Sequence, residues 1–281
     1  MKKRPGSGPK LTNAARPATF EVEAYNERGE MVPTAIAGEH PLTLYLDKRE
    51  LVTLMTLGHA PEALAIGYLR NQRLVASVED IAAVQVDWET ESVAITTHGK
   101  INVDKKMQKR TVTTGCGQGT MYGDLMEDVE KVILRQDVSL TDADLFLLLE
   151  KVRRHETIYK QAGAVHGCAL ASTAGEILMF VEDVGRHNAV DAIAGFMWLE
   201  AIDGSDKLFY TTGRLTSEMV IKCAQMRIPF LVSRSGLTHM GHAIAHKVGI
   251  TMLGRASGRH YLAFTGKERL VRTTQQPTAL A

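Results

Sequence analysis

The chain has 281 residues, of which 44% are hydrophobic and 23% are charged, a balance typical of a globular protein with a sizeable core. Its formal net charge of +1 provides no general field that would draw it to nucleic acid or to a membrane surface. Three cysteines are too few for a disulfide framework and fit a reducing compartment. We therefore expect a cytoplasmic protein with no nucleic-acid or membrane partner.

The chain divides into five parts by composition. Residues 1–20 are basic and lack the apolar run of a secretory signal, so we expect a disordered tail there. Residues 21–103 predict a small α+β domain, and residues 104–126 an exposed loop. Residues 127–266 predict an α/β domain that binds a cofactor, and residues 267–281 a second tail.

Short strands dominate the first domain. Apolar alternation predicts strands over residues 42–47, 51–55, 82–89 and 92–98. A single helix interrupts them. It begins at Pro61, and its apolar residues recur at helical spacing as far as Leu74.

After residue 126 the pattern changes to alternating strands and helices. We expect a capped amphipathic helix over residues 139–156. Strands are expected over residues 163–172, 176–184, 207–213, 229–236, 250–255 and 260–264. Helices are expected over residues 187–201, 217–227 and 238–248. This alternation argues for a mostly parallel sheet with helices on its faces.

Four segments that follow predicted strands combine arginine with small residues. They contain Gly185, Arg186 and His187; Gly213 and Arg214; Ser233 and Arg234; and Arg255, Ala256, Ser257, Gly258 and Arg259. Ligands bind beyond the carboxyl ends of such strands, and glycine N–H groups and guanidinium forks both suit phosphate. The pattern predicts a site for a ligand with several phosphates, although any one of these arginines could instead pair with a carboxylate.

The segment EDVGRH, residues 182–187, also holds two carboxylates and an imidazole. His187 could act as a general acid or base. A structural role, in which Glu182 or Asp183 fixes the loop, is equally open. His166 is expected to be a strand-end histidine that packs or orients.

Cys116 stands in the glycine-rich stretch TTGCGQGTMYG, residues 113–123. Exposure and nearby backbone dipoles would lower the pKa of its thiol, and the thiolate could then attack sulfur and carry a persulfide. Basic residues precede it and would favour the thiolate: Lys105, Lys106, Lys109 and Arg110. The alternative is a loop cysteine without chemistry.

The other cysteines and a histidine row have plainer interpretations. Cys168 and Cys223 lie in apolar or small-residue runs and are expected in the core. His239, His242 and His246 share one face of a predicted helix, which is also a spacing seen in metal sites. No cysteine or carboxylate accompanies them, so we expect an ordinary helix face and no metal.

Several segments together resemble a known family. EDVGRHNAVD, TTGRLTSEMVIKCAQMRIP and GITMLGRASGR follow one another in the order and spacing of the formate dehydrogenase accessory sulfurtransferases, the FdhD family. The upstream PEALAIGYL and TGCG also match. The resemblance extends from about Pro41 to Phe264.

The resemblance implies a function. Members accept sulfur from a cysteine desulfurase as a persulfide and pass it to the molybdenum bis(molybdopterin guanine dinucleotide) cofactor of formate dehydrogenase. It places the persulfide on Cys116 and the cofactor segment on Arg255 to His260, with GDP as a mimic of the cofactor. It also implies a homodimer and a three-layer core like that of cytidine deaminase, to which the smaller N-terminal α+β domain is added.

The sequence departs from the family at one position. Gly119 stands where members often have a second cysteine. Either Cys116 works alone, Cys168 substitutes, or sulfur transfer is impaired. We favour the first interpretation, because one thiolate is enough to hold a persulfide.

Three other functions compete with sulfur transfer. A chaperone could bind and deliver the molybdenum cofactor with Cys116 dispensable, and the glycine at 119 keeps this alternative open. A deaminase-type zinc hydrolase needs H-x-E and P-C-x-x-C motifs, which the sequence lacks. A nicotinamide dehydrogenase is disfavoured because no G-x-G-x-x-G opens a strand-to-helix turn.

Overall fold

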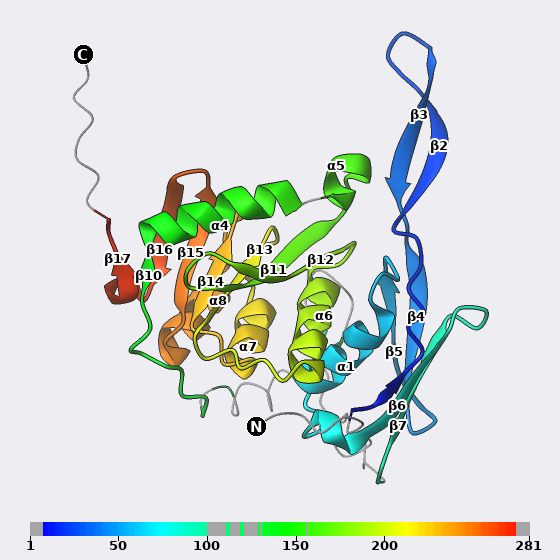
Figure 1. The fold of residues 1–281 in the computed structure, drawn as a ribbon, viewed down its shortest axis with the longest axis horizontal. Coiled ribbons are helices and arrows are strands. Elements are labelled where there is room, and N and C mark those ends of the chain that lie inside the picture. Colours follow the sequence, from blue (N-terminus) through cyan, green and yellow to red (C-terminus); the bar gives the residue numbers. More distant parts are fainter. Residues whose placement is uncertain are drawn as a thin grey trace. The chain divides into compact units, whose positions relative to one another are not determined.

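A computed structural model describes residues 8–99, 111–112, 119–120, 129, 131–155 and 157–273 (Figure 1). Cys116 lies outside the described residues. The chain forms two compact units. Unit 1 comprises Met1–Lys131, Glu156–Cys168 and Phe180–Ile202, and unit 2 comprises Val132–His155, Ala169–Met179 and Asp203–Ala281. The predicted boundary near residue 104 does not separate these two units. Two segments that lie beyond it, Glu156–Cys168 and Phe180–Ile202, belong to unit 1.

A five-stranded sheet forms the base of unit 1. Its strands run in the order β1-β6-β7-β4-β5. They are β1 (Lys10–Leu11), β4 (His40–Leu46), β5 (Arg49–Thr56), β6 (Ile81–Asp87) and β7 (Ser92–Thr97), and the short helix η1 (Val78–Asp80) precedes β6. The pairs β4–β5 and β6–β7 are antiparallel and β4–β7 is parallel. The four strands predicted in this region are confirmed.

Two helices of unit 1 cross at glycines. Helix α1 (Pro61–Asn71) packs on α6 (Arg186–Leu199). A Cβ atom on Gly67 would lie 1.6 Å from the carbonyl oxygen of Asp191, and one on Gly195 would lie 1.9 Å from that of Ala63. The backbones therefore approach so closely that only glycine fits at the crossing.

The N-terminal residues are more ordered than their composition suggested. Strand β1 pairs in parallel with β6, and the Ala14 N–H donates to the Glu62 carboxylate at 2.8 Å. The Arg16 guanidinium lies 4.9 Å from the centre of the Trp88 ring, a cation–π contact. Residues 10–16 therefore pack on unit 1, which differs from the expected disordered tail.

A separate hairpin precedes this sheet. It pairs β2 (Thr19–Tyr25) with β3 (Met31–Ala37) in antiparallel register and extends away from β4 and β5 (Figure 1). Asn26 forms its turn, because the side-chain oxygen accepts from the N–H groups of Arg28 and Glu30. The short helix α5 (Ile158–Ala162) packs on both strands.

Unit 2 holds most of a six-stranded sheet with the strand order β12-β11-β13-β14-β15-β16. The strands are β11 (His166–Ser172), β12 (Ile177–Asp183), β13 (Lys207–Thr211), β14 (Phe230–Ser233), β15 (Thr251–Ser257) and β16 (His260–Thr265). Strands β13, β14 and β15 are parallel neighbours, whereas β16 pairs antiparallel with β15. The α/β class is confirmed; the cytidine-deaminase-like layering stays a prediction.

The helices of unit 2 begin close to where the sequence predicted. They are α4 (Asp142–His155), α7 (Ser217–Gln225) and α8 (His239–Val248). A second short pair, β10 (Leu140–Thr141) with β17 (Leu270–Val271), joins the start of α4 to the end of the described chain. In the part of the chain that the structure describes, no helix is long and apolar enough to cross a membrane.

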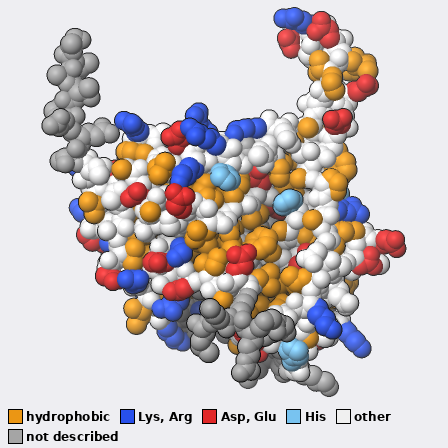
Figure 2. Space-filling view, in the orientation of Figure 1, with side chains coloured by type: hydrophobic (Ala, Val, Ile, Leu, Met, Phe, Trp, Pro, Cys, Tyr) orange, Lys and Arg blue, Asp and Glu red, His pale blue; other side chains and the backbone are white. Residues whose placement is uncertain are grey.

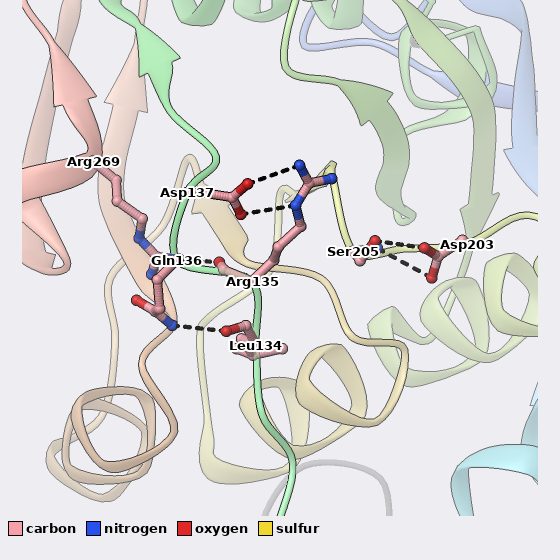
Figure 3. Close-up of polar contacts among 7 residues, drawn as sticks. All are labelled: Leu134, Arg135, Gln136, Asp137, Asp203, Ser205 and Arg269. Carbon is pink, nitrogen blue, oxygen red and sulfur yellow. Dashed lines mark hydrogen bonds and ion pairs between the residues drawn. The ribbon is translucent and has the colours of Figure 1, made fainter.

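Residues near 267, expected to begin a tail, instead pack on unit 2. The short helix η2 (Lys267–Arg269) ends in a buried arginine. The Arg269 guanidinium donates to the carbonyl oxygens of Arg135, at 3.1 Å, and Gly249. Figure 3 shows the contact between Arg269 and Arg135 beside the bidentate ion pair of Arg135 and Asp137. The arginine therefore connects both ends of the described part of unit 2.

Candidate functional site

Glu182 fixes a loop of unit 1. It lies near the end of β12 and is only 5% exposed. Its carboxylate accepts from the N–H groups of Ile158 and Tyr159, at 3.0 and 2.9 Å, and from the Thr157 N–H at 3.1 Å. These are the first N–H groups of α5, which have no partner within the helix. The geometry supports the structural interpretation of this carboxylate.

Asp183 joins the end of β5 to the start of α6. Its two oxygens accept from the Thr56 hydroxyl at 2.5 Å, the Leu57 N–H at 3.2 Å, the Gly185 N–H at 2.9 Å and the Asn188 amide at 2.8 Å. Burial raises the pKa of Asp183, and these hydrogen bonds oppose that rise. The carboxyl therefore holds two distant parts of the chain together.

The remaining residues of this segment lie in the interior. Gly185 caps the N-terminus of α6, and the next two residues begin the helix. Arg186 is 5% exposed and His187 is 1% exposed. The sequence predicted them on an open loop, and the structure buries both side chains. Their roles in cofactor binding and in acid–base chemistry stay predictions.

In unit 2, two predicted loops leave the same edge of the sheet. Thr211 at the end of β13 is level with Ser233 at the end of β14. The Ser233 hydroxyl donates to the carbonyl oxygen of Gly213 at 2.6 Å and accepts from the Ser235 N–H at 2.9 Å. The loops are thus bonded to each other. The adjacent strand β15 joins them, because the Arg255 N–H donates to the carbonyl oxygen of Ser235 at 2.8 Å.

Three exposed arginines come from this edge: Arg214, Arg234 and Arg255. We call them the arginine edge. Among the described residues, the guanidinium groups of Arg214 and Arg255 form no hydrogen bond or ion pair. Within the described part of the chain, neither arginine pairs with a carboxylate. Unpaired guanidinium groups are suited to bind an anion.

Two helix N-termini follow the same loops. Thr216 and Thr238 are the N-cap residues of α7 and α8. The Thr238 hydroxyl accepts from the Gly241 N–H at 3.1 Å. Because helix N-termini carry partial positive charge, both helices add to the positive potential near the arginine edge.

The last predicted loop is a strand for most of its length. Strand β15 continues through Ser257, with a bulge after Gly254 and a φ of +53° at Arg255. Gly254 lies within β15, where its missing side chain makes room for the Phe264 ring, which a Cβ atom would approach to 2.9 Å. Ala256 is also buried.

The predicted cofactor segment therefore divides in two. Arg255 belongs to the arginine edge, whereas Ser257, Gly258 and Arg259 line a different cavity of about 630 Å³. Its other wall is α4, with Phe146 and Arg153 among the lining residues. His260 is exposed and pairs with Ser257 across the turn.

One polar pair near the arginine edge was missed in the sequence. Glu218 and Lys222 lie one turn apart in α7, with 3.3 Å between Nζ and Oε1, and each side chain is 2% exposed. An ion pair this deeply buried requires close partners on all sides. The signal was present, because Glu and Lys stand four residues apart in an otherwise apolar helix.

The two remaining cysteines and the histidine row lie in unit 2 or at its border. Cys168 and Cys223 are both fully buried, as expected for core residues, and burial counts against Cys168 as a second carrier thiol. The His242 ring nitrogen lies 3.3 Å from the carbonyl oxygen of Phe264. Within the described ranges no group of three or more His, Cys, Asp or Glu residues is placed to hold a metal ion.

Comparisons with known proteins agree on one family. Residues 37–271 match the model of the FdhD/NarQ family. The sulfur carrier protein FdhD of Listeria monocytogenes is 30% identical over 260 residues, covering 89% of this chain and 95% of the relative. The protein of the same name from Wolinella succinogenes is 29% identical, covering 83% of this chain and 81% of the relative.

A solved structure supports the same relationship. A crystal structure from Desulfotalea psychrophila, named as a formate dehydrogenase accessory protein, matches with a TM-score of 0.76 and 26% identity. The match covers 91% of this chain and all of the other chain. The likeness thus extends over both units.

Proposed function

The chain belongs to the FdhD/NarQ family, and from that membership we propose that it is a sulfur carrier protein required for formate dehydrogenase activity. Relatives over most of its length are named sulfur carrier proteins. We further propose that a cysteine desulfurase is the sulfur donor, that Cys116 carries the sulfur, and that the molybdenum bis(molybdopterin guanine dinucleotide) cofactor is the acceptor substrate.

The loading step is a thiol exchange. The Cys116 thiolate attacks the outer sulfur of the donor's persulfide, a new S–S bond forms on Cys116, and the donor's S–S bond breaks. The electron pair of that bond leaves with the donor cysteine as a thiolate. One thiolate is sufficient for this step, so Gly119 in place of a second cysteine does not prevent it.

The acceptor is proposed to bind at the arginine edge. The observation that carries this assignment is the pair of exposed guanidinium groups, on Arg214 and Arg255, that have no partner among the described residues. The cofactor carries two pyrophosphates, and arginine forks match phosphate oxygens in a bidentate manner. Backbone N–H groups at the starts of α7 and α8 favour the same charge.

A cofactor chaperone is the second candidate. It would bind the molybdenum cofactor at the same edge and deliver it, without sulfur chemistry at Cys116. The feature that favours it is Gly119, because members of the family often have a cysteine there. The two candidates share the binding site and differ in the thiol.

Mass spectrometry of the Cys116 peptide separates the two candidates. The protein is incubated with a cysteine desulfurase and L-cysteine, without reductant. Sulfur carriage predicts one added sulfur on Cys116, none in Cys116→Ser, and loss of formate dehydrogenase maturation in that variant. Unmodified Cys116 with full maturation in Cys116→Ser would instead favour the chaperone.

A further inference from the structure

The β2–β3 hairpin is amphipathic. Its register places Phe20 opposite Ile36 and Ala24 opposite Val32. Because alternate residues of a strand face the same way, these side chains and Val22 share one side, which we call the apolar hairpin face. Figure 2 shows hydrophobic side chains along the hairpin and charged side chains at its tip.

The apolar hairpin face is open. The exposed fractions are 45% for Phe20, 37% for Val22, 37% for Val32 and 46% for Ile36. A two-stranded hairpin is marginally stable by itself in water, and the short helix α5, which packs on this one, leaves these four side chains exposed. A contiguous exposed apolar strip of this kind marks an interaction surface.

The hairpin is also acidic. Residues 19–37 contain four glutamates and one arginine, a formal charge of −3, although the whole chain carries +1. Glu21 and Glu23 face away from the apolar side, and Glu27 and Glu30 are at or beside the turn. This charge suits a partner whose apolar surface is bordered by lysine and arginine. It would repel an anionic cofactor.

One edge of the hairpin can accept another strand. Strand β3 contains Pro33, which has no N–H, and α5 packs mainly on this strand. Strand β2 has no proline, and among the described residues it pairs with β3 only. Every second N–H and C=O of β2 therefore points away from β3, where an added strand would bind.

We propose that the β2–β3 hairpin is the docking site for the protein that donates sulfur, which would align a strand with β2 and place basic side chains beside Glu21 and Glu23. This inference rests on the proposed function. The hairpin leads into β4 after two residues, and β7 of the same sheet leads into the chain segment that carries Cys116. The arginine edge, by contrast, belongs to unit 2.

The test compares charge reversals at two places in unit 1. The variant Glu21→Lys/Glu23→Lys changes the hairpin, and Glu89→Lys/Glu200→Lys makes the same charge change at two other exposed positions. Binding of purified cysteine desulfurase is measured by calorimetry. We expect about tenfold or greater weakening for the hairpin variant and none for the control. Val22→Thr/Val32→Thr, which keeps the strand shape, should weaken binding without adding charge.

A loading assay separates this inference from the proposed function. Inorganic polysulfide can load Cys116 without a docked protein, so the hairpin variants should load from polysulfide as wild type does. From limiting desulfurase they should load slowly, and excess desulfurase should restore the rate. Unchanged desulfurase binding in both hairpin variants would overturn the inference while leaving sulfur carriage intact.

Two further outcomes count against the inference or its premise. If light scattering shows that the hairpin variants lose a dimer that wild type forms, and desulfurase still binds normally, a second copy of the chain covers the hairpin. If wild-type Cys116 takes sulfur from neither polysulfide nor the desulfurase, the proposed function itself fails.

Discussion

The segment at Glu182–His187 and the arginine edge share a short sequence pattern, in which an apolar run leads to glycine or serine and then arginine. In unit 1 the arginine is 5% exposed, and the carboxylates just before it hold α5, β5 and α6 in place. In unit 2 the arginines are exposed, and two of them have no partner among the described residues. Adjacent acidic residues distinguish the two cases: EDVGRH contains its own carboxylates, whereas TTGRLT and SRSG contain none.

The largest expected effect comes from disrupting the packing of α1 on α6, the helix that begins in the Glu182–His187 segment. Gly67→Ala would place a Cβ atom 1.6 Å from a backbone oxygen of α6, and neither helix backbone can move away without losing its packing. We expect a loss of about 4 kcal/mol or more in the free energy of unfolding, or no folded protein. Urea unfolding measures it. Gly99→Ala, where the added atom has open space, is the control, and equal stability of the two variants would contradict the crossing.

Asp183→Asn tests the carboxyl that joins β5 to α6. The amide would point N–H groups at N–H donors, and we expect a loss of about 2 kcal/mol. Burial raises the pKa of Asp183. The carboxyl group therefore binds a proton more tightly in the folded state than in the unfolded state. The contribution of this carboxyl to the free energy of unfolding is therefore largest below its pKa in the unfolded state. It decreases as pH rises through its pKa in the folded state.

The stability gap between wild type and Asp183→Asn should thus be widest in acid and narrow towards neutral pH. Thermal unfolding of both proteins across that range measures the gap, because the contributions of other titrating groups cancel. A gap that widens with pH would mean that the four hydrogen bonds outweigh burial at this site.

Substitutions at the arginine edge should change ligand binding and leave stability unchanged, unlike the two substitutions in unit 1. Arg214→Glu and Arg255→Glu should each weaken GDP binding by about tenfold to a hundredfold, because charge-assisted contacts to phosphate are lost. The melting temperature should stay at the wild-type value. Lys267→Glu makes the same charge change at an exposed position elsewhere in unit 2 and should bind normally. Normal GDP binding by both edge variants would remove the site from this edge.

The smallest expected effect sharpens the contrast within unit 1. Arg16→Ala removes the cation–π contact to Trp88 and should lower the free energy of unfolding by about 1 kcal/mol. Arg28→Ala should have no measurable effect, because its side chain is 74% exposed. Urea unfolding followed by tryptophan fluorescence measures both. Equal stability of the two variants would mean that the contact between Arg16 and Trp88 adds no stability.

Local patterns were sufficient for most elements. Pro61 marked the start of α1, and the apolar periodicity of residues 187–201 marked α6 to within two residues. Neither pattern could place α6 beside α1, because that contact depends on two glycines 128 positions apart in the chain, Gly67 and Gly195. The contact between Gly254 and Phe264 depends in the same way on the fold, which alone brings the ring against the glycine.

The sequence predicted which residues make up the candidate site, but it predicted the positions of only some of them. The pattern found Arg214 and Arg234 correctly at the ends of β13 and β14. It grouped Arg255 with Arg259, although a strand register and a bulge direct them to different surroundings. The burial of Arg186 and His187 could not be predicted from the segment EDVGRH alone, because it depends on other segments that pack around these side chains.

The crossing of α1 and α6 also bears on how the protein is made. During synthesis α1 leaves the ribosome long before α6 is translated, so the groove at Gly67 stays empty while more than a hundred further residues are added. The face of α1 that packs on α6 must therefore stay uncovered until α6, which begins at residue 186 of 281, has been made. A ribosome that stalls before residue 202 would release a chain with this face open, a natural substrate for chaperones.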